Sequence, residues 1–150
     1  MLALAFAPFA YIACGKYEQA NSYLDELVIL ADDKGALFWK ALGQAYQGCI
    51  MALTGHSSKA VQLINSGIAG YRSTGATVYS PLHLSILANA FAEIGQFDDA
   101  LRCIDEAVTL IETSKERWWQ SEVNRAAGEV ALKLPEPDAQ KAEKYFQSCS

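Results

Sequence analysis

The pattern Gly-x-x-x-x-Ala recurs every 40 residues, and this spacing constrains the fold more than any other feature of the chain. The copies begin at Gly15, Gly55 and Gly95, and a looser fourth copy extends from Gly128 to Ala142. No catalytic residue type recurs with them. An internal period of this length is typical of arrays of stacked helices, which usually function by binding other proteins.

Apolar and small residues on both sides of each glycine are spaced three and four residues apart. In the third copy the large residues Phe91 and Ile104 stand four before and nine after Gly95, and the small residue Ala100 stands five after it. This spacing predicts two amphipathic helices joined at the glycine, which ends the first helix because a left-handed backbone costs glycine little. One pair cannot bury its own apolar stripe, so the next pair must stack on it.

The pattern therefore predicts an all-α fold, a right-handed α-solenoid of about four helix pairs with a period of about 40 residues. We expect one domain over residues 1–150, with repeats at about 1–34, 36–73, 81–114 and 117–149. The expected helices span 7–14, 17–32, 36–54, 57–72, 81–94, 97–114, 117–134 and 138–149. Pro8 is unfavourable inside a helix, so the first helix is expected to be short or kinked.

The composition excludes several partners. Half of the 150 residues are apolar (51%), which is enough for a real core. The net charge is −5 and the lysines and arginines do not gather on one face, so the basic surface that nucleic-acid binding requires is missing. No apolar segment reaches the roughly 20 residues of a membrane span. We expect neither nucleic acid nor a membrane as a partner.

The four cysteines form no C-x-x-C motif, and no histidine stands near them in sequence. They are Cys14, Cys49, Cys103 and Cys149. Small buried thiols between helices are favoured over a disulfide or a metal site, and a reducing cytoplasm fits this interpretation. We expect no metal ion and no cofactor.

The first fourteen residues leave one alternative open. The segment from Ile12 to Gly15 is similar to a bacterial lipoprotein cleavage site, with cleavage before Cys14. However, no lysine or arginine precedes the apolar run, as a signal peptide requires, and the run is in register with the first helix of the repeat. A cytoplasmic location is preferred.

The third copy, Gly95-Gln-Phe-Asp-Asp-Ala100, resembles the tetratricopeptide repeat, whose signature is small–large–Gly–x–aromatic–x–x–Ala. Ordinary repeats of that family have about 34 residues, whereas the step here is 40. The longer step resembles the helical arrays at the C-terminal ends of large bacterial signalling proteins. These include adenylate/guanylate cyclases fused to an ATPase module, and large transcriptional activators of similar layout.

The resemblance to the cyclase–ATPase chains covers roughly residues 40–149. It is carried by Arg72-x-x-Gly75, Pro81-x-x-Leu84 and the run from Glu116 to Glu129. The phosphate-binding loop and the metal-binding aspartates of such proteins are absent from the sequence. The resemblance therefore implies a regulatory segment that is a fragment of a larger bacterial signalling protein.

In a fold of this kind the first helices of successive pairs line a concave groove. The second pair would contribute Ala45, Cys49, Ala52 and Leu53, and the later pairs would contribute polar residues. These candidate partner-binding residues are Ser85, Asn89, Glu93, Glu122, Arg125, Glu129 and Lys133. Asn89 could fix a peptide backbone through its donor and its acceptor, although a solvated amide or one bonded within the array is the alternative.

Trp118 and Trp119 form a second candidate interface. Adjacent helical residues point about 100° apart, so the two side chains cannot both be buried on one stripe. We expect one to pack in the core. Packing within the fold or between repeats is the favoured interpretation of the pair, and the alternative is that the other tryptophan is an interface anchor, since tryptophan is enriched at interfaces.

Catalysis is not expected. His56 and His83 stand in no catalytic arrangement, and Glu122 and Glu129 with Arg125 between them indicate an ion-paired surface. The sequence favours a protein-interaction and assembly module that binds a peptide, a neighbouring domain or a second copy through its groove or an exposed end. The alternative is an array that senses a small effector and regulates an attached cyclase, ATPase or DNA-binding domain. A deep apolar pocket ringed by polar groups would favour that alternative.

Overall fold

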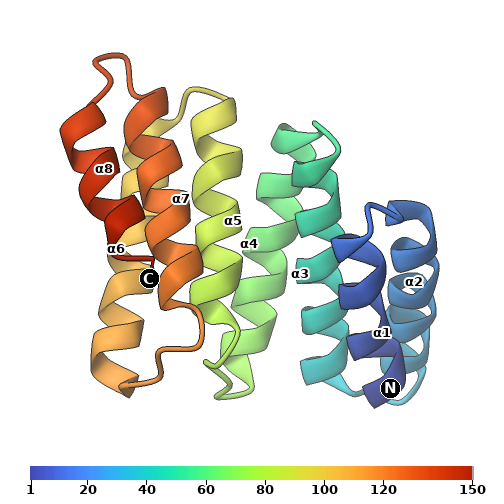
Figure 1. Cartoon of the computed structure of the whole chain (residues 1–150). Helices are drawn as coiled ribbons and strands as arrows, with labels where there is room; N and C mark the ends of the chain where they lie inside the picture. Colours follow the sequence, from blue (N-terminus) through green and yellow to red (C-terminus); the bar gives the residue numbers. More distant parts are fainter. Residues whose placement is uncertain (150) are drawn as a thin grey trace. The chain divides into compact units, whose positions relative to one another are not determined.

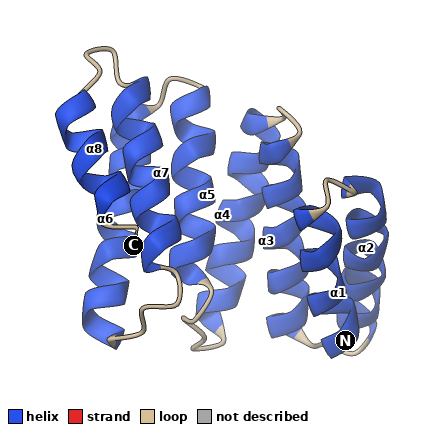
Figure 2. Ribbon diagram, in the orientation of Figure 1, coloured by secondary structure: helices blue, strands red, loops and turns tan. Residues whose placement is uncertain are grey.

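The computed structural model describes residues 1–149, which form eight α-helices and no strand (Figures 1 and 2). The helices are α1 (Leu2–Ala13), α2 (Tyr17–Asp33), α3 (Leu37–Leu53), α4 (Ser57–Ser73), α5 (Ser80–Glu93), α6 (Phe97–Ser114), α7 (Gln120–Lys133) and α8 (Ala139–Gln147). The all-α prediction is confirmed, and each expected helix after the first matches within three residues at both ends. The right-handed solenoid stays a prediction.

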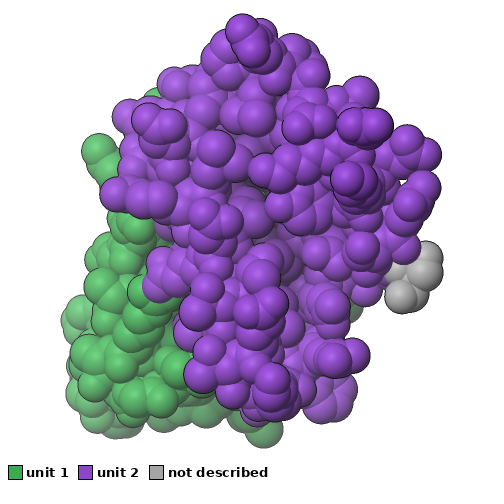
Figure 3. Space-filling view, turned by 90° about the vertical axis from the view of Figure 1, so that its left-hand side faces the viewer, with its two compact units in different colours: residues 1–77 green, residues 78–150 purple. Residues whose placement is uncertain are grey.

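The chain forms two compact units, Met1–Thr77 and Val78–Ser150, each of which contains two of the expected helix pairs (Figure 3). In the first unit, α2 packs against both α1 and α3, and α3 packs against α4. In the second unit, α7 packs against α5, α6 and α8, and α5 also packs against α6.

A left-handed glycine stands at every twentieth residue from 15 to 95. Gly15, Gly35, Gly55, Gly75 and Gly95 have φ angles between 62° and 83°. At most of these sites the residue after the glycine donates its N–H to the carbonyl five residues earlier, as Lys16 does to Tyr11 (2.8 Å) and Gln96 to Phe91 (2.9 Å). This hydrogen bond is the helix-ending Schellman motif. The same turn therefore ends helices both within a pair and between pairs. Its spacing of 20 residues is half of the 40-residue period seen in the sequence.

Glycine 48 and glycine 67 bring α3 and α4 into close contact. A Cβ atom added to Gly67 would lie 2.7 Å from the backbone nitrogen of Ala45, and one added to Gly48 would lie 2.6 Å from Cγ1 of Ile64. Ala45 and Ile64 are fully buried. At each of these two glycines the backbone lies directly against the other helix, with no room for a Cβ atom. The close contact of α3 with α4 therefore requires glycine at both positions.

The first helix is longer than expected. It begins at Leu2, and Pro8 lies inside it. Proline at this position removes one backbone hydrogen bond, but its ring is buried and lines, with Phe9, Ile12 and Tyr46, a small hollow that leaves no room for a water molecule. The rings of Phe9 and Tyr46 meet edge to face with their centroids 4.9 Å apart. Packing therefore outweighs the poor helix propensity of Pro8.

Lysine 115 interrupts the series of glycines. It follows Gly95 by 20 residues and has φ 61°, a left-handed conformation that costs a side chain with a Cβ about 1–2 kcal/mol. We therefore expect Lys115→Gly to raise the free energy of unfolding by about 0.5–1 kcal/mol, since the greater flexibility of glycine in the unfolded chain offsets part of the gain.

Chemical denaturation checks this expectation. Glu112→Gly is the matched control, because Glu112 is exposed and lies within α6. There the same substitution should lower the free energy of unfolding by about 0.5–1 kcal/mol. Destabilisation by both variants would show that the left-handed strain at Lys115 is negligible.

Gly67→Ala should destabilise the first unit. The added methyl group would overlap the backbone of Ala45, and overpacking of this kind costs about 1–3 kcal/mol, more than the gain of up to about 1 kcal/mol in helix propensity. Ser66→Ala is the control, because Ser66 is exposed on the same helix. Thermal melting should show a lower Tm for Gly67→Ala only; an unchanged or higher Tm would contradict the close helix contact.

Candidate interaction surface

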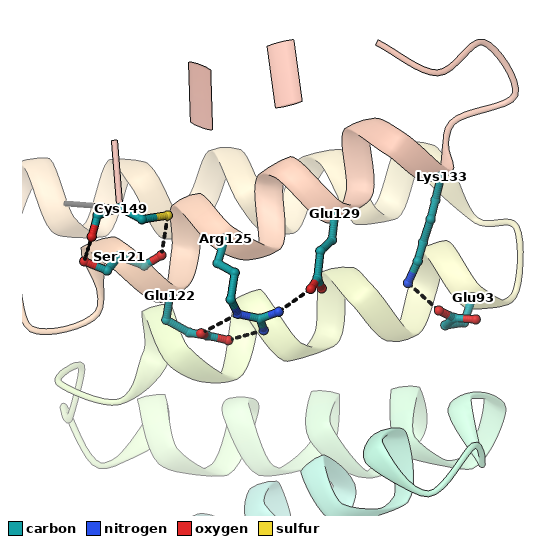
Figure 4. A network of polar contacts seen from close by, with 7 residues as sticks. All are labelled: Glu93, Ser121, Glu122, Arg125, Glu129, Lys133 and Cys149. Atoms are coloured by element: carbon teal, nitrogen blue, oxygen red, sulfur yellow. Dashed lines mark hydrogen bonds and ion pairs between the residues drawn. The ribbon is translucent and has the colours of Figure 1, made fainter. Parts of the chain in front are cut away.

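Five of the predicted site residues form ion pairs along α7 and the end of α5. Arg125 donates through Nε and Nη2 to the two carboxylate oxygens of Glu122, at 2.8 and 2.6 Å, and through Nη1 to Glu129. One turn further, Lys133 donates to Glu93 of α5. Figure 4 shows Glu122, Arg125, Glu129 and Lys133 projecting from the same side of α7, toward the helix that carries Glu93. We call these five residues the α7 row.

The geometry of the α7 row follows from its spacing. Glu122, Arg125, Glu129 and Lys133 are three or four residues apart, so they are neighbours on one helix face. The hydrogen bond with Glu122 is the main cause that raises the pKa of Arg125, while partial burial acts in the opposite direction. Because the paired side chains are 29–45% exposed, water screens them and the pairs contribute little to stability. They place charges of alternating sign next to one another on one face of α7.

The other predicted groove residues are placed differently. Ser85 is fully buried, and its hydroxyl donates to the carbonyl of Leu82 (2.7 Å), so its assignment to an open groove is wrong. Ala45 and Cys49 are also buried, because α3 packs closely on α4 at this level. Asn89 is half-buried, and its Oδ1 atom is buried without a hydrogen-bond partner among the described residues.

The two adjacent tryptophans diverge as expected. Trp119 is half-buried; its Nε1 donates to the carbonyl of Val78 (2.9 Å), and its ring packs against Tyr79. Trp118 is 80% exposed. The prediction that one side chain packs and the other does not is confirmed. Contact of Trp118 with a partner stays a prediction.

The cysteines only partly follow the expectation of buried thiols. Cys49 and Cys103 are buried, which confirms the prediction for these two, but Cys14 is exposed at the end of α1. Burial raises the pKa of Cys49 to about 12, so this thiol is protonated and unreactive.

Within residues 1–149, no three histidine, cysteine, aspartate or glutamate side chains are grouped to hold a metal ion. None of the helices described here combines the length and apolar character of a membrane span.

A hollow of about 560 Å³ opens beside the α5–α6 turn and the α7–α8 connection. Phe97, Leu101 and Leu134 contribute apolar surface, and Asp98 and Glu136 contribute carboxylates. It is open to solvent and is not the deep apolar pocket that would indicate a small effector. Sequence reasoning missed this hollow; the proline-containing insertion between α7 and α8 was the signal that the two helices separate there.

No known protein family, curated protein or solved structure matches the chain. The tetratricopeptide resemblance and the relation to bacterial signalling proteins stay predictions.

Buried His83 makes stability depend on pH. Burial lowers the pKa of His83 to about 3, from 6.5 in an unfolded chain. As the pH falls below 6.5, the unfolded chain therefore gains a proton that the folded chain does not, and stability decreases. Between pH 7.5 and 5.0 the expected loss from this group is about 2 kcal/mol.

Urea denaturation at the two pH values measures the loss. His83→Gln should show a pH dependence smaller by that amount, because glutamine does not titrate. His56→Gln is the control, since His56 is exposed in a turn, and it should behave like the parent chain. Equal pH dependence in His83→Gln and the parent would mean that folding does not lower the pKa of His83.

Proposed function

We propose that the chain is a non-catalytic protein-interaction module of a bacterial signalling protein, acting in the cytoplasm and binding a peptide segment or a neighbouring domain at the α7 row. The observation that carries this proposal is the fixed alternation of charge along one face of α7, from Glu122 through Arg125 and Glu129 to Lys133. Preoriented charges select a partner of complementary pattern and suppress others.

The neighbouring residues suit the same role. Asn89 lies one turn before Glu93 on α5, and its Oδ1 is an acceptor without a hydrogen-bond partner among residues 1–149. Leaving a buried acceptor unsatisfied is costly, so we infer that the Asn89 side chain turns outward when it accepts a hydrogen bond from a peptide N–H. Because water already screens the ion pairs of the α7 row, we expect a partner to bind this surface with modest affinity, and we expect salt to weaken the binding.

The alternative function, sensing of a small effector, has weaker support. The hollow beside the α5–α6 turn has apolar and acidic lining residues, but it is broad and open. Small-molecule sites usually enclose most of the ligand surface. The α7 row therefore carries the proposal.

Selection of peptides from a random display library on the full chain tests the proposed function. Selected peptides should carry both signs of charge and bind more weakly as salt increases. Arg125→Glu would place four carboxylates together and should weaken binding at least about 10-fold, equivalent to about 1.4 kcal/mol.

Arg102→Glu is the matched control. Arg102 also pairs with a carboxylate three residues away, Asp99, but on α6, and it is exposed. The same change of charge there should leave peptide binding nearly unchanged. Equal loss in both variants would mean that only net charge matters, and no loss in either would remove the α7 row from the binding site.

A further inference from the structure

The connection between α7 and α8 forms one wall of the open hollow in the second unit. It has five residues, 134–138, whereas the connections from α3 to α4 and from α5 to α6 have three. Figure 1 shows it at the same end of the second unit as the α5–α6 turn. The hollow of about 560 Å³ opens beside these two segments. It therefore lies where the chain departs from the short glycine turn.

This wall is constrained at several points. Glu136 stands between Pro135 and Pro137, which restrict the backbone angles of the connection. The N–H of Asp138 donates to the carbonyl of Ala131 in the last turn of α7 (3.1 Å), and the Asp138 carboxylate caps the start of α8. A partner would therefore meet a preformed surface, and little of the binding free energy would be lost in ordering the connection.

The hollow combines apolar surface with two carboxylates. Phe97, Leu101 and Leu134 line it and are half-buried. Asp98, in the first turn of α6, and Glu136, in the connection, are exposed. In the part of the chain that the structure describes, no lysine or arginine lines the hollow. The surface is thus complementary to a cation that carries an apolar stem.

The two carboxylates differ from their neighbours because they are unpaired. The residue after Asp98, Asp99, pairs with Arg102. Asp98 and Glu136 form no ion pair within residues 1–149. An acidic residue in the first turn of a helix is favoured by the helix dipole, which accounts for Asp98. Glu136 lies outside the helices, so the dipole does not account for it.

We propose that this hollow binds an arginine side chain presented by an extended segment of a partner protein. The methylene stem of the arginine would lie on Leu101 and Leu134, and its guanidinium would stack on the ring of Phe97. The planar guanidinium has five N–H donors, so it would pair with Asp98 on one wall and Glu136 on the other. Because the hollow is open, the backbone of the partner would remain outside it.

Three other occupants fit less well. Lysine carries one compact and strongly hydrated ammonium group, which is poorly suited to pair with two carboxylates from different segments. An apolar side chain would leave both carboxylates without a counter-charge and partly remove them from water. A small free cation would have most of its surface exposed in a hollow of this shape.

Binding of one side chain would be weak. We expect a Kd on the order of 1 mM for a short arginine peptide, and a larger contribution when the same partner is also held elsewhere on the chain. The net charge of −5 attracts a basic segment at longer range. This inference rests on the proposed function as an interaction module, but it uses a different surface from the α7 row.

Titration of the isotopically labelled full chain, followed by NMR, tests the proposal. The ligand is a capped peptide with one arginine between four glycines. The amide signals of Gly95, Phe97, Asp98 and Glu136 should shift together, with a Kd on the order of 1 mM. The same peptide with citrulline, an uncharged analogue of similar shape, should bind at least about 5-fold more weakly, because the charge-assisted hydrogen bonds are lost. A lysine peptide should also bind more weakly.

Substitution of the two carboxylates tests their roles. Asp98→Asn and Glu136→Gln should each weaken binding of the arginine peptide at least about 3-fold and leave the citrulline peptide unchanged. Asp99→Asn is the matched control, because it removes the same charge from the adjacent residue, which does not line the hollow. It should bind like the parent chain. Circular dichroism melting establishes that each variant is folded before it is compared.

Several outcomes would overturn the proposal. These are no shift at the residues that line the hollow, equal binding of the citrulline, lysine or leucine peptide, or equal weakening by Asp99→Asn. Binding of ethylguanidinium as tight as that of the arginine peptide would make the hollow a site for a small cation and would overturn it as well.

The proposed function has a separate readout. Failure here would leave that function intact if the parent chain still binds selected peptides through Arg125. Loss of selected peptides in Arg125→Glu, with binding of the arginine peptide unchanged, would show that the two surfaces act independently.

Discussion

The three-residue glycine turn is the constraint on which the rest of the structure depends. Because the left-handed glycine and one residue on each side of it connect two helices, the second helix must return directly along the first. Helices α2, α3 and α4 each have 17 residues, so successive turns fall at alternating ends of the unit. Helices held this closely need small residues where they cross, and Gly48 and Gly67 supply them between α3 and α4. The recurring glycines and the buried small residues are two consequences of one short connection.

The sequence predicted the helices well because the turn leaves a repeated mark, and it predicted burial less well. Positions counted from Gly95 give the direction of a side chain around α5, but they do not show how many neighbouring side chains cover it. Ser85 was assigned to an open groove for this reason, although it is buried. The ion pairs of Arg125 with Glu122 and Glu129 were predicted correctly because spacings of three and four residues determine which side chains of one helix can meet, whereas the pair of Lys133 with Glu93 joins two helices and was not predicted. The start of the first helix was predicted too late, at residue 7, because the poor helix propensity of Pro8 suggested a short or kinked helix, whereas the packing of Pro8 with Tyr46 supports a helix that begins at Leu2.

The α7 row combines recognition by charge with little effect on stability. It holds three carboxylates and two cations in ion pairs that water reaches, so the pairs contribute little to the free energy of unfolding. A surface of this kind would select a partner by its charge pattern, and salt should weaken that recognition.

Two of the connections that are longer than the three-residue glycine turn occupy equivalent positions in the 40-residue repeat. The longer connections before α5 and before α7 contain Tyr79 and Trp119, which stand 40 residues apart and pack against each other. Trp119 also donates to the carbonyl of Val78, so one connection anchors the other. The connection before α7 begins at Lys115, whose backbone is left-handed although the residue carries a Cβ atom. The anchoring of Trp119 leaves the neighbours Val78 and Trp118 on the outside, where Trp118 is 80% exposed. The exposed tryptophan is thus a consequence of the anchored connection, and its position on the repeat does not depend on a binding partner.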